Sequence, residues 1–182
     1  MAHQRFIWLS TLLCMAQVYS MPTKCELQRR LVETCHHLLE SMGGAFPFRC
    51  FKDYVLVPFP KDAFESSKQE TIAMEKSIYI TLEYIDSMLN NDGLPDQWTA
   101  QEELDYFQHI VFRLIEENKC VMSKTQDSLD DFLNREASLR AYFQKITAVL
   151  IEKDFQYCAW EFARIKILRA LQFILNDGYR TT

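Results

Sequence analysis

Residues 139–161 read LRAYFQKITAVLIEKDFQYCAWE, and this stretch decides the fold. Its apolar side chains recur every three or four positions up to Leu150, which is the period of one face of an α-helix. A polar break follows, and the apolar pattern starts again at Tyr157. The stretch therefore predicts two consecutive helices, over about 128–153 and about 157–176.

Three earlier segments have the same period, one over about 24–42, one from Ser67 and one from Thr99. Ser67 precedes Glu70 by three residues and Thr99 precedes Glu102 by three, which is the spacing of a capping box at a helix N-terminus. All five prolines lie outside the predicted helices. We therefore expect an all-α fold, a bundle of about five helices.

The amino-acid composition excludes several classes of protein. The chain has only four Gly and five Pro in 182 residues, whereas a sandwich or barrel needs turn residues about every 8–12 positions. The glycine-rich motifs of nucleotide-binding loops cannot be written anywhere in the chain. The isoelectric point near 5.4 argues against a nucleic-acid partner, because binding to phosphates depends on Lys and Arg.

No pattern of residues indicates catalysis or metal binding. Glu33 and His36 form one E-x-x-H pair, but the second pair that a di-metal bundle uses is missing. His36 and His37 are adjacent, so they point about 100° apart on a helix and cannot hold one ion together. We predict that the protein is not an enzyme and has no metal site and no cofactor.

The first twenty residues are typical of a secretory signal peptide. Arg5 precedes an apolar run from Ile7 to Ala16, and compact residues precede a cut after Ser20. Ten apolar residues are too few to span a bilayer, which needs about 20. We therefore predict a signal peptide over 1–20, a secreted single domain over 21–182, and no membrane insertion.

One predicted connection is much longer than the others. Residues 43–66 contain three prolines and five phenylalanines, and a connection of this length in a compact domain is normally functional. Its aromatic side chains can pack it down, and Cys50 can tie it to the bundle. A long overhand loop between the first two helices is what a long-chain helical cytokine bundle with crossover topology requires.

Five cysteines remain once the predicted signal peptide is removed. We expect them to pair where geometry allows, because the secretory route is oxidising. An odd number leaves at least one thiol over, and two bonds among five cysteines allow about 15 pairings. Spacing alone does not choose between these pairings. The five are Cys25, Cys35, Cys50, Cys120 and Cys158.

Charge is unevenly divided along the chain. Residues 62–117 hold 13 acidic and 3 basic side chains, whereas residues 21–61 and 118–182 each carry a net charge of +2. Most of these charges are typical of solvated helix surfaces. The division also predicts two surfaces of opposite field, which suits two different partners.

A signature crosses the last two predicted helices: Tyr142 and Phe143, then Ile146 and Leu150, then Cys158-Ala159-Trp160. Three further segments continue the pattern in chain order, namely residues 48–60, residues 97–99 and residues 164–169. By these residues the chain resembles the type I interferons over essentially its whole mature length. Its spacing is more similar to the four-cysteine fish branch than to the mammalian members.

The resemblance implies two disulfide bonds, Cys25–Cys120 and Cys50–Cys158, with Cys35 left as a free thiol. It also implies that the signature residues are structural and pack in the core. These residues are Tyr142, Phe143, Ala159 and Trp160.

The resemblance further implies a monomeric, secreted antiviral cytokine that joins two different class II cytokine receptor chains and starts JAK–STAT signalling. Exposed side chains of the overhand loop and the last helix would bind one receptor chain, and Arg140 would lie on the surface for the other. The loop and last-helix residues are Phe51, Lys52, Tyr54, Arg164, Leu168 and Arg169. Tyr54 stands where mammalian members carry an arginine.

Two alternatives remain open at the level of the sequence. One is another long-chain helical cytokine, such as a relative of interleukin-10. The other is a secreted helical carrier protein, which would need a hollow core for an apolar ligand.

Overall fold

The computed structural model describes residues 25–64, 71–90, 94, 98, 101–125 and 129–177. Within these ranges the chain forms α-helices and short 3₁₀ helices, with no β-strand. The predicted signal peptide, the box of Ser67 and Glu70, and Thr99 lie outside the described residues. The elements are α2 (Arg29–Gly43), η1 (Phe48–Asp53), η2 (Lys61–Ala63), α3 (Thr71–Leu89), α4 (Gln101–Asn118), η3 (Lys119–Ser123), α5 (Leu129–Glu152) and α6 (Tyr157–Asp177).

Helices α2 to α6 correspond to the five predicted helices, so the all-α prediction is confirmed. The first of them starts later than expected, at Arg29 rather than near residue 24. Residues 25–28 are not helical, and Cys25 is bonded to Cys120 in η3. The disulfide bond therefore holds this segment against the end of another helix instead of letting it extend α2.

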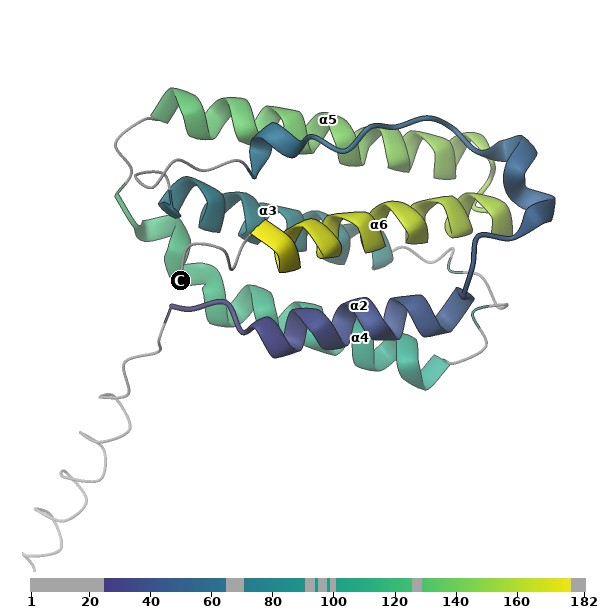
Figure 1. The fold of residues 1–182 in the computed structure, drawn as a ribbon, viewed down its shortest axis with the longest axis horizontal. Coiled ribbons are helices and arrows are strands. Elements are labelled where there is room, and N and C mark those ends of the chain that lie inside the picture. The colour runs from purple at the N-terminus through teal and green to yellow at the C-terminus, as the bar shows by residue number, and fades with distance from the viewer. Residues whose placement is uncertain are drawn as a thin grey trace, which may run out of the picture.

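The long connection after α2 determines the order of the helices in space (Figure 1). It crosses back along α5 before α3 begins, so α2, α3 and α5 run in one direction and α4 and α6 in the other. Helix α2 packs against α4 and α6, α3 packs against α4 and α5, and α5 packs against α6. This is the overhand connection that the length of segment 43–66 predicts.

Helix α6 is enclosed by its neighbours, because it contacts α2, α3, α5 and η1. Its apolar residues Trp160, Ile167 and Leu171 are completely buried. Its buried set also contains three charged residues. A charge that is removed from water is tolerated only when it is paired and hydrogen-bonded. The three residues are Glu161, Arg164 and Lys166.

Glu161 and Arg164 form a buried ion pair at 2.8 Å between Oε2 and Nη2. Trp98 donates from Nε1 to Glu161 Oε1 at 2.8 Å. Arg164 donates from Nη1 to the backbone carbonyl of Leu39 at 3.2 Å and from Nη2 to that of Gly44 at 2.9 Å. The network thus joins α6 to the end of α2 and to the segment before α4.

This network corrects one prediction from the sequence. Arg164 was expected to be exposed and to bind a receptor chain, but its side chain is fully buried. The guanidinium packs so tightly against the end of α2 that a Cβ atom at Gly43 would collide with it. A glycine is therefore required where α2 passes Arg164.

The signature residues lie in the core. Tyr142 donates its hydroxyl proton to the Lys166 carbonyl at 3.0 Å. Phe143 stacks on Tyr84, with ring centroids 5.1 Å apart. Trp160 meets Trp98 edge to face at 5.6 Å. These three residues and Ala159 are all buried, so they act by packing helices together.

The structure contains the two disulfide bonds that the resemblance implies. Cys25–Cys120 closes a sequence separation of 95 residues and Cys50–Cys158 one of 108. On chain-entropy grounds, loops of this length contribute about 4–5 kcal/mol each by restricting the unfolded chain. Cys35 is the free cysteine of the described residues, and it is buried.

Replacing Arg164 is expected to leave the Glu161 carboxylate buried without a counter-ion. We expect Arg164→Met to lower the free energy of unfolding by about 3–5 kcal/mol, and Arg169→Met, at an exposed position, to change it by less than about 0.5 kcal/mol. Urea denaturation followed by circular dichroism measures both. Equal effects of the two substitutions would contradict the assignment of Arg164 to the core.

The Cys35 thiol is expected to be inert in the folded protein. Burial raises its pKa from 9.0 to about 12, so at pH 8 only about one thiol in ten thousand is ionised, against about one in ten for an exposed group. Iodoacetamide at pH 8 should therefore label Cys35 only after unfolding, as read by peptide mass spectrometry. Rapid labelling of the folded protein would show that the core around α2 opens.

Candidate functional site

The 3₁₀ helix η1 sorts its residues onto three faces. Side chains three residues apart eclipse one another in a 3₁₀ helix. Phe48 and Phe51 therefore share one face, with ring centroids 5.8 Å apart. A second face carries Cys50, which is bonded to Cys158, and Asp53, whose carboxylate is 3.3 Å from Lys153 Nζ. One face is thus anchored to the bundle while another is free to meet a partner.

The third face of η1 is basic. It carries Arg49 and Lys52, which line a surface hollow together with Gln156 and Tyr157 at the start of α6. The Arg49 guanidinium carbon lies 4.4 Å from the centre of the Tyr157 ring. Lys52, a predicted receptor contact, is exposed here.

The outward face of η1 continues into an exposed apolar patch, which we call the overhand-loop surface. Phe48 is 90% exposed and Leu56 is 83% exposed, although both are large apolar side chains. Several large apolar side chains exposed within one short segment are typical of an interaction site. The overhand-loop surface comprises Phe48, Phe51, Tyr54, Val55 and Leu56.

Only Phe51 and Tyr54 of this surface were singled out from the sequence. Phe48, Val55 and Leu56 were missed, because apolar residues in a loop are expected to pack it down. Val57 and Phe59 do pack down. The three-residue period across η1 is the signal that could have identified Phe48.

Contacts with α5 and α6 hold the loop in place beneath this surface. Phe59 stacks on Phe173 at 4.4 Å between ring centroids and meets Tyr142 edge to face at 5.3 Å. Arg135 of α5 donates to the carbonyl of Ala63 at 3.2 Å. Such contacts order the loop before a partner arrives, which lowers the entropic cost of binding.

Two predicted residues of α6 remain candidates on the same side of the molecule. Arg169 is exposed and Leu168 is half-buried. Burial raises the pKa of Tyr142, the positive charge of Arg169 opposes this increase, and Tyr54 adds to it. Arg169 follows Lys166 by three residues, so the two share one face of α6, and Lys166 bonds Tyr54 of the overhand-loop surface.

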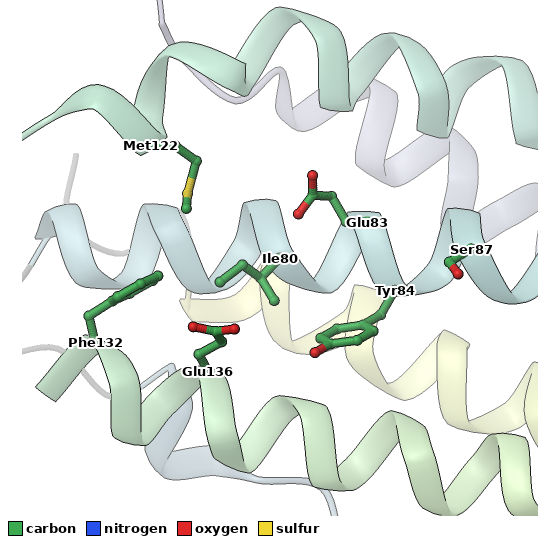
Figure 2. A pocket seen from close by; sticks show the side chains of 7 residues that line it. All are labelled: Ile80, Glu83, Tyr84, Ser87, Met122, Phe132 and Glu136. Atoms are coloured by element: carbon green, nitrogen blue, oxygen red, sulfur yellow. The ribbon is translucent and has the colours of Figure 1, made fainter. Parts of the chain in front are cut away.

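A second candidate surface is an open cleft of about 360 Å³ between α3 and α5, which we call the α3–α5 cleft (Figure 2). Apolar side chains line most of it. The Glu136 carboxylate reaches from α5 towards α3, whereas the Glu83 carboxylate lies on the side of α3 that points away from α5. Arg140 was the only residue predicted here. Its guanidinium pairs with Glu136 at the edge of the cleft. The lining residues are Ile80, Glu83, Tyr84, Ser87, Met122, Phe132 and Glu136.

Negatively charged side chains lie on the α3 side of the cleft. The pKa of Tyr79 rises to about 12, first because the hydroxyl is desolvated and then because Glu83 accepts its hydrogen bond and adds negative charge. The charge of Glu116 on α4 adds to the same effect. Glu83 of α3 and Glu116 of α4 therefore both act on Tyr79, between these two helices.

Two further observations on the described residues concern metal binding and membrane spanning. No group of three or more His, Cys, Asp or Glu side chains lies in an arrangement that could hold a metal ion. Among the described helices, none has the length and apolarity needed to cross a membrane.

Comparisons with known proteins agree with this geometry. Residues 25–176 match the family described as "Interferon alpha/beta domain". Interferon alpha-7 and interferon alpha-17 of Homo sapiens are 30% and 31% identical to this chain over 145 residues, which covers 76% of this chain and 75% of each relative.

The solved structure of zebrafish interferon 2 is similar with a TM-score of 0.78 and 41% sequence identity, over 84% of this chain and 99% of that chain. The helical bundle therefore has the helical cytokine fold, and its two disulfide bonds fit the fish branch. On the match across residues 25–176, the chain belongs to the interferon alpha/beta family, the type I interferons.

Proposed function

We propose that the chain is secreted after removal of residues 1–20 and that residues 21–182 act as a monomeric antiviral cytokine. It joins two different class II cytokine receptor chains and so starts JAK–STAT signalling. Membership of the interferon family supports this proposal. The observation that carries it is the overhand-loop surface, where large apolar side chains stand exposed on an anchored loop.

The loop-side receptor chain binds the overhand-loop surface together with Lys52, Leu168 and Arg169. Exposed aromatic side chains on a preordered backbone are typical of binding hot spots, because a few of them contribute most of the free energy of binding. Arg164 contributes from the core and does not contact the receptor. The basic residues around the patch increase the rate of association with an acidic partner.

The second receptor chain binds the other surface, at the α3–α5 cleft and Arg140. The cleft offers an apolar floor and two carboxylates, which suit a partner segment with apolar and basic side chains. Joining two receptor chains requires only two surfaces on one rigid body, so the protein acts by binding rather than by catalysis. The family match argues against the first alternative, a relative of interleukin-10. The two hollows described above are open to the surface, so they do not favour the second alternative, a carrier of an apolar ligand.

The direct test is an antiviral reporter assay with purified residues 21–182 in cells of the source species. We expect reporter induction, and we expect it to disappear in cells that lack the interferon receptor chains. Correctly disulfide-bonded protein that is inactive, or activity that persists without the receptor chains, would overturn the proposed function.

Substitutions on the two surfaces should weaken binding to different receptor chains. We expect Phe51→Ala to lower affinity for the loop-side chain by about tenfold to a hundredfold, because a packed aromatic anchor is lost. Glu83→Lys should instead weaken binding to the second chain, because it reverses the charge of the cleft. Surface plasmon resonance with each isolated receptor ectodomain separates the two effects.

Phe112→Ala is the matched control for Phe51→Ala. Phe112 is exposed to a similar extent, 55% against 60%, but lies on α4. It should leave affinity for the loop-side chain unchanged. If Phe51→Ala and Phe112→Ala weaken binding to the loop-side receptor chain equally, the overhand-loop surface is not the binding site for that chain.

A further inference from the structure

Lys166 is a buried cation directly beneath the overhand-loop surface. Its side chain is only 1% exposed. The ammonium Nζ lies 3.1 Å from Tyr54 Oη and 3.1 Å from the Val57 carbonyl oxygen. It also lies 4.8 Å from the centre of the Tyr54 ring and 5.1 Å from that of Phe162. Every contact is therefore with a neutral dipole or an aromatic ring.

Within the described ranges, Lys166 has no carboxylate partner at ion-pair distance, in contrast to Arg164, which has Glu161. Neutral dipoles and aromatic rings solvate an ammonium group but do not cancel its charge. The charge of Lys166 therefore reaches the surface above it, in a place where little water screens it. Two exposed basic residues lie near in the chain: Arg169 follows Lys166 by three residues on α6, and Lys52 precedes Tyr54 by two.

Tyr54 connects this buried charge to the exterior. A lysine ammonium can only donate hydrogen bonds, so Tyr54 Oη accepts from Lys166 and its own O–H proton remains to be donated. In the part of the chain that the structure describes, no acceptor takes that proton. The Tyr54 side chain is 42% exposed, so the acceptor can come from a bound partner.

Lys166 donates a hydrogen bond to Tyr54 Oη. Accepting this bond makes the Tyr54 hydroxyl a stronger hydrogen-bond donor. Hydrogen bonds in series polarise one another, so each bond in the chain from Lys166 through Tyr54 to the partner strengthens the next. Tyr54 meets the Phe46 ring edge to face at 5.6 Å, and the next two residues along the chain, Val55 and Leu56, are exposed apolar side chains that would help exclude water once a partner docks. A hydrogen bond inside such an apolar rim is both stronger and more selective than one in open solvent.

We propose that Tyr54 donates a hydrogen bond to a carboxylate side chain of the loop-side receptor chain, and that Lys166 is the positioning residue that orients Tyr54 and supplies the complementary charge. The inference rests on the proposed function and names the receptor group that faces Tyr54. An acidic side chain at this point is selected over a neutral one because it alone compensates the buried ammonium.

The test measures affinity of the full mature chain for the loop-side receptor ectodomain by surface plasmon resonance. Tyr54→Phe keeps the ring and removes the hydroxyl, and Lys166→Met keeps most of the length but removes the charge together with the hydrogen bonds to Tyr54 and Val57. We expect each substitution to lower affinity about tenfold, and the double variant to lose no more than either single variant. Raising the salt concentration should weaken the wild type more than it weakens Lys166→Met.

Four controls separate a direct role from a structural one. Tyr106→Phe removes the same hydroxyl from an exposed tyrosine of α4 and should leave affinity unchanged. Lys166→Arg should restore part of the affinity that Lys166→Met loses. Affinity for the second receptor chain should be the same in all variants. Hydrogen exchange of the amides of residues 54–57 should be unaltered in Tyr54→Phe, because the Lys166–Val57 bond remains.

Wild-type affinity in Tyr54→Phe, or losses that multiply in the double variant, would overturn the inference and leave the proposed function standing. A wild-type protein that binds neither receptor chain would overturn both.

Discussion

The buried charges of α6 are the constraint on which the rest of the structure depends. Because α2, α3, α5 and η1 all pack on this helix, Glu161, Arg164 and Lys166 cannot reach bulk water. Each must find polar partners in the chain around it, and several of those partners lie in the connections between helices. Trp98, Gly44 and Val57 are bonded in this way, so the same contacts that satisfy α6 also hold the overhand connection and the segment before α4 in place.

This arrangement explains how an apolar surface can remain exposed on a loop. A free loop with five large apolar side chains would bury them against the bundle. Here the Cys50–Cys158 bond, the Asp53–Lys153 pair and the Lys166–Val57 hydrogen bond hold the backbone with Phe48 and Leu56 outward. The stability of the core is therefore used to keep a binding surface ordered. Helix α5 both supports this loop and forms one side of the α3–α5 cleft.

The helices and their order along the chain were predictable, because the three-to-four-residue spacing of apolar side chains is a local property of the sequence. The long, proline- and phenylalanine-rich segment 43–66 likewise predicted an overhand connection. The candidate site was less predictable. Arg164 and Arg169 look equivalent in the sequence, yet one lies in the core and the other on the surface. The difference arises because α6 is enclosed on more sides than its own apolar stripe indicates. Leu56 was expected to be buried but is exposed. The burial of a loop residue depends on the contacts that hold the loop, and these are not visible in the local sequence.

The sequence by itself therefore determined the helical bundle, the overhand loop and, through the resemblance, the family and the two disulfide pairings. Only the tertiary structure decided which charged residues of α6 belong to the core, which loop side chains face outward, and that Tyr54 lies over the ammonium of Lys166. The physical reason is that periodicity and capping are local, whereas burial and charge compensation depend on residues more than a hundred positions apart that only the packed bundle brings together.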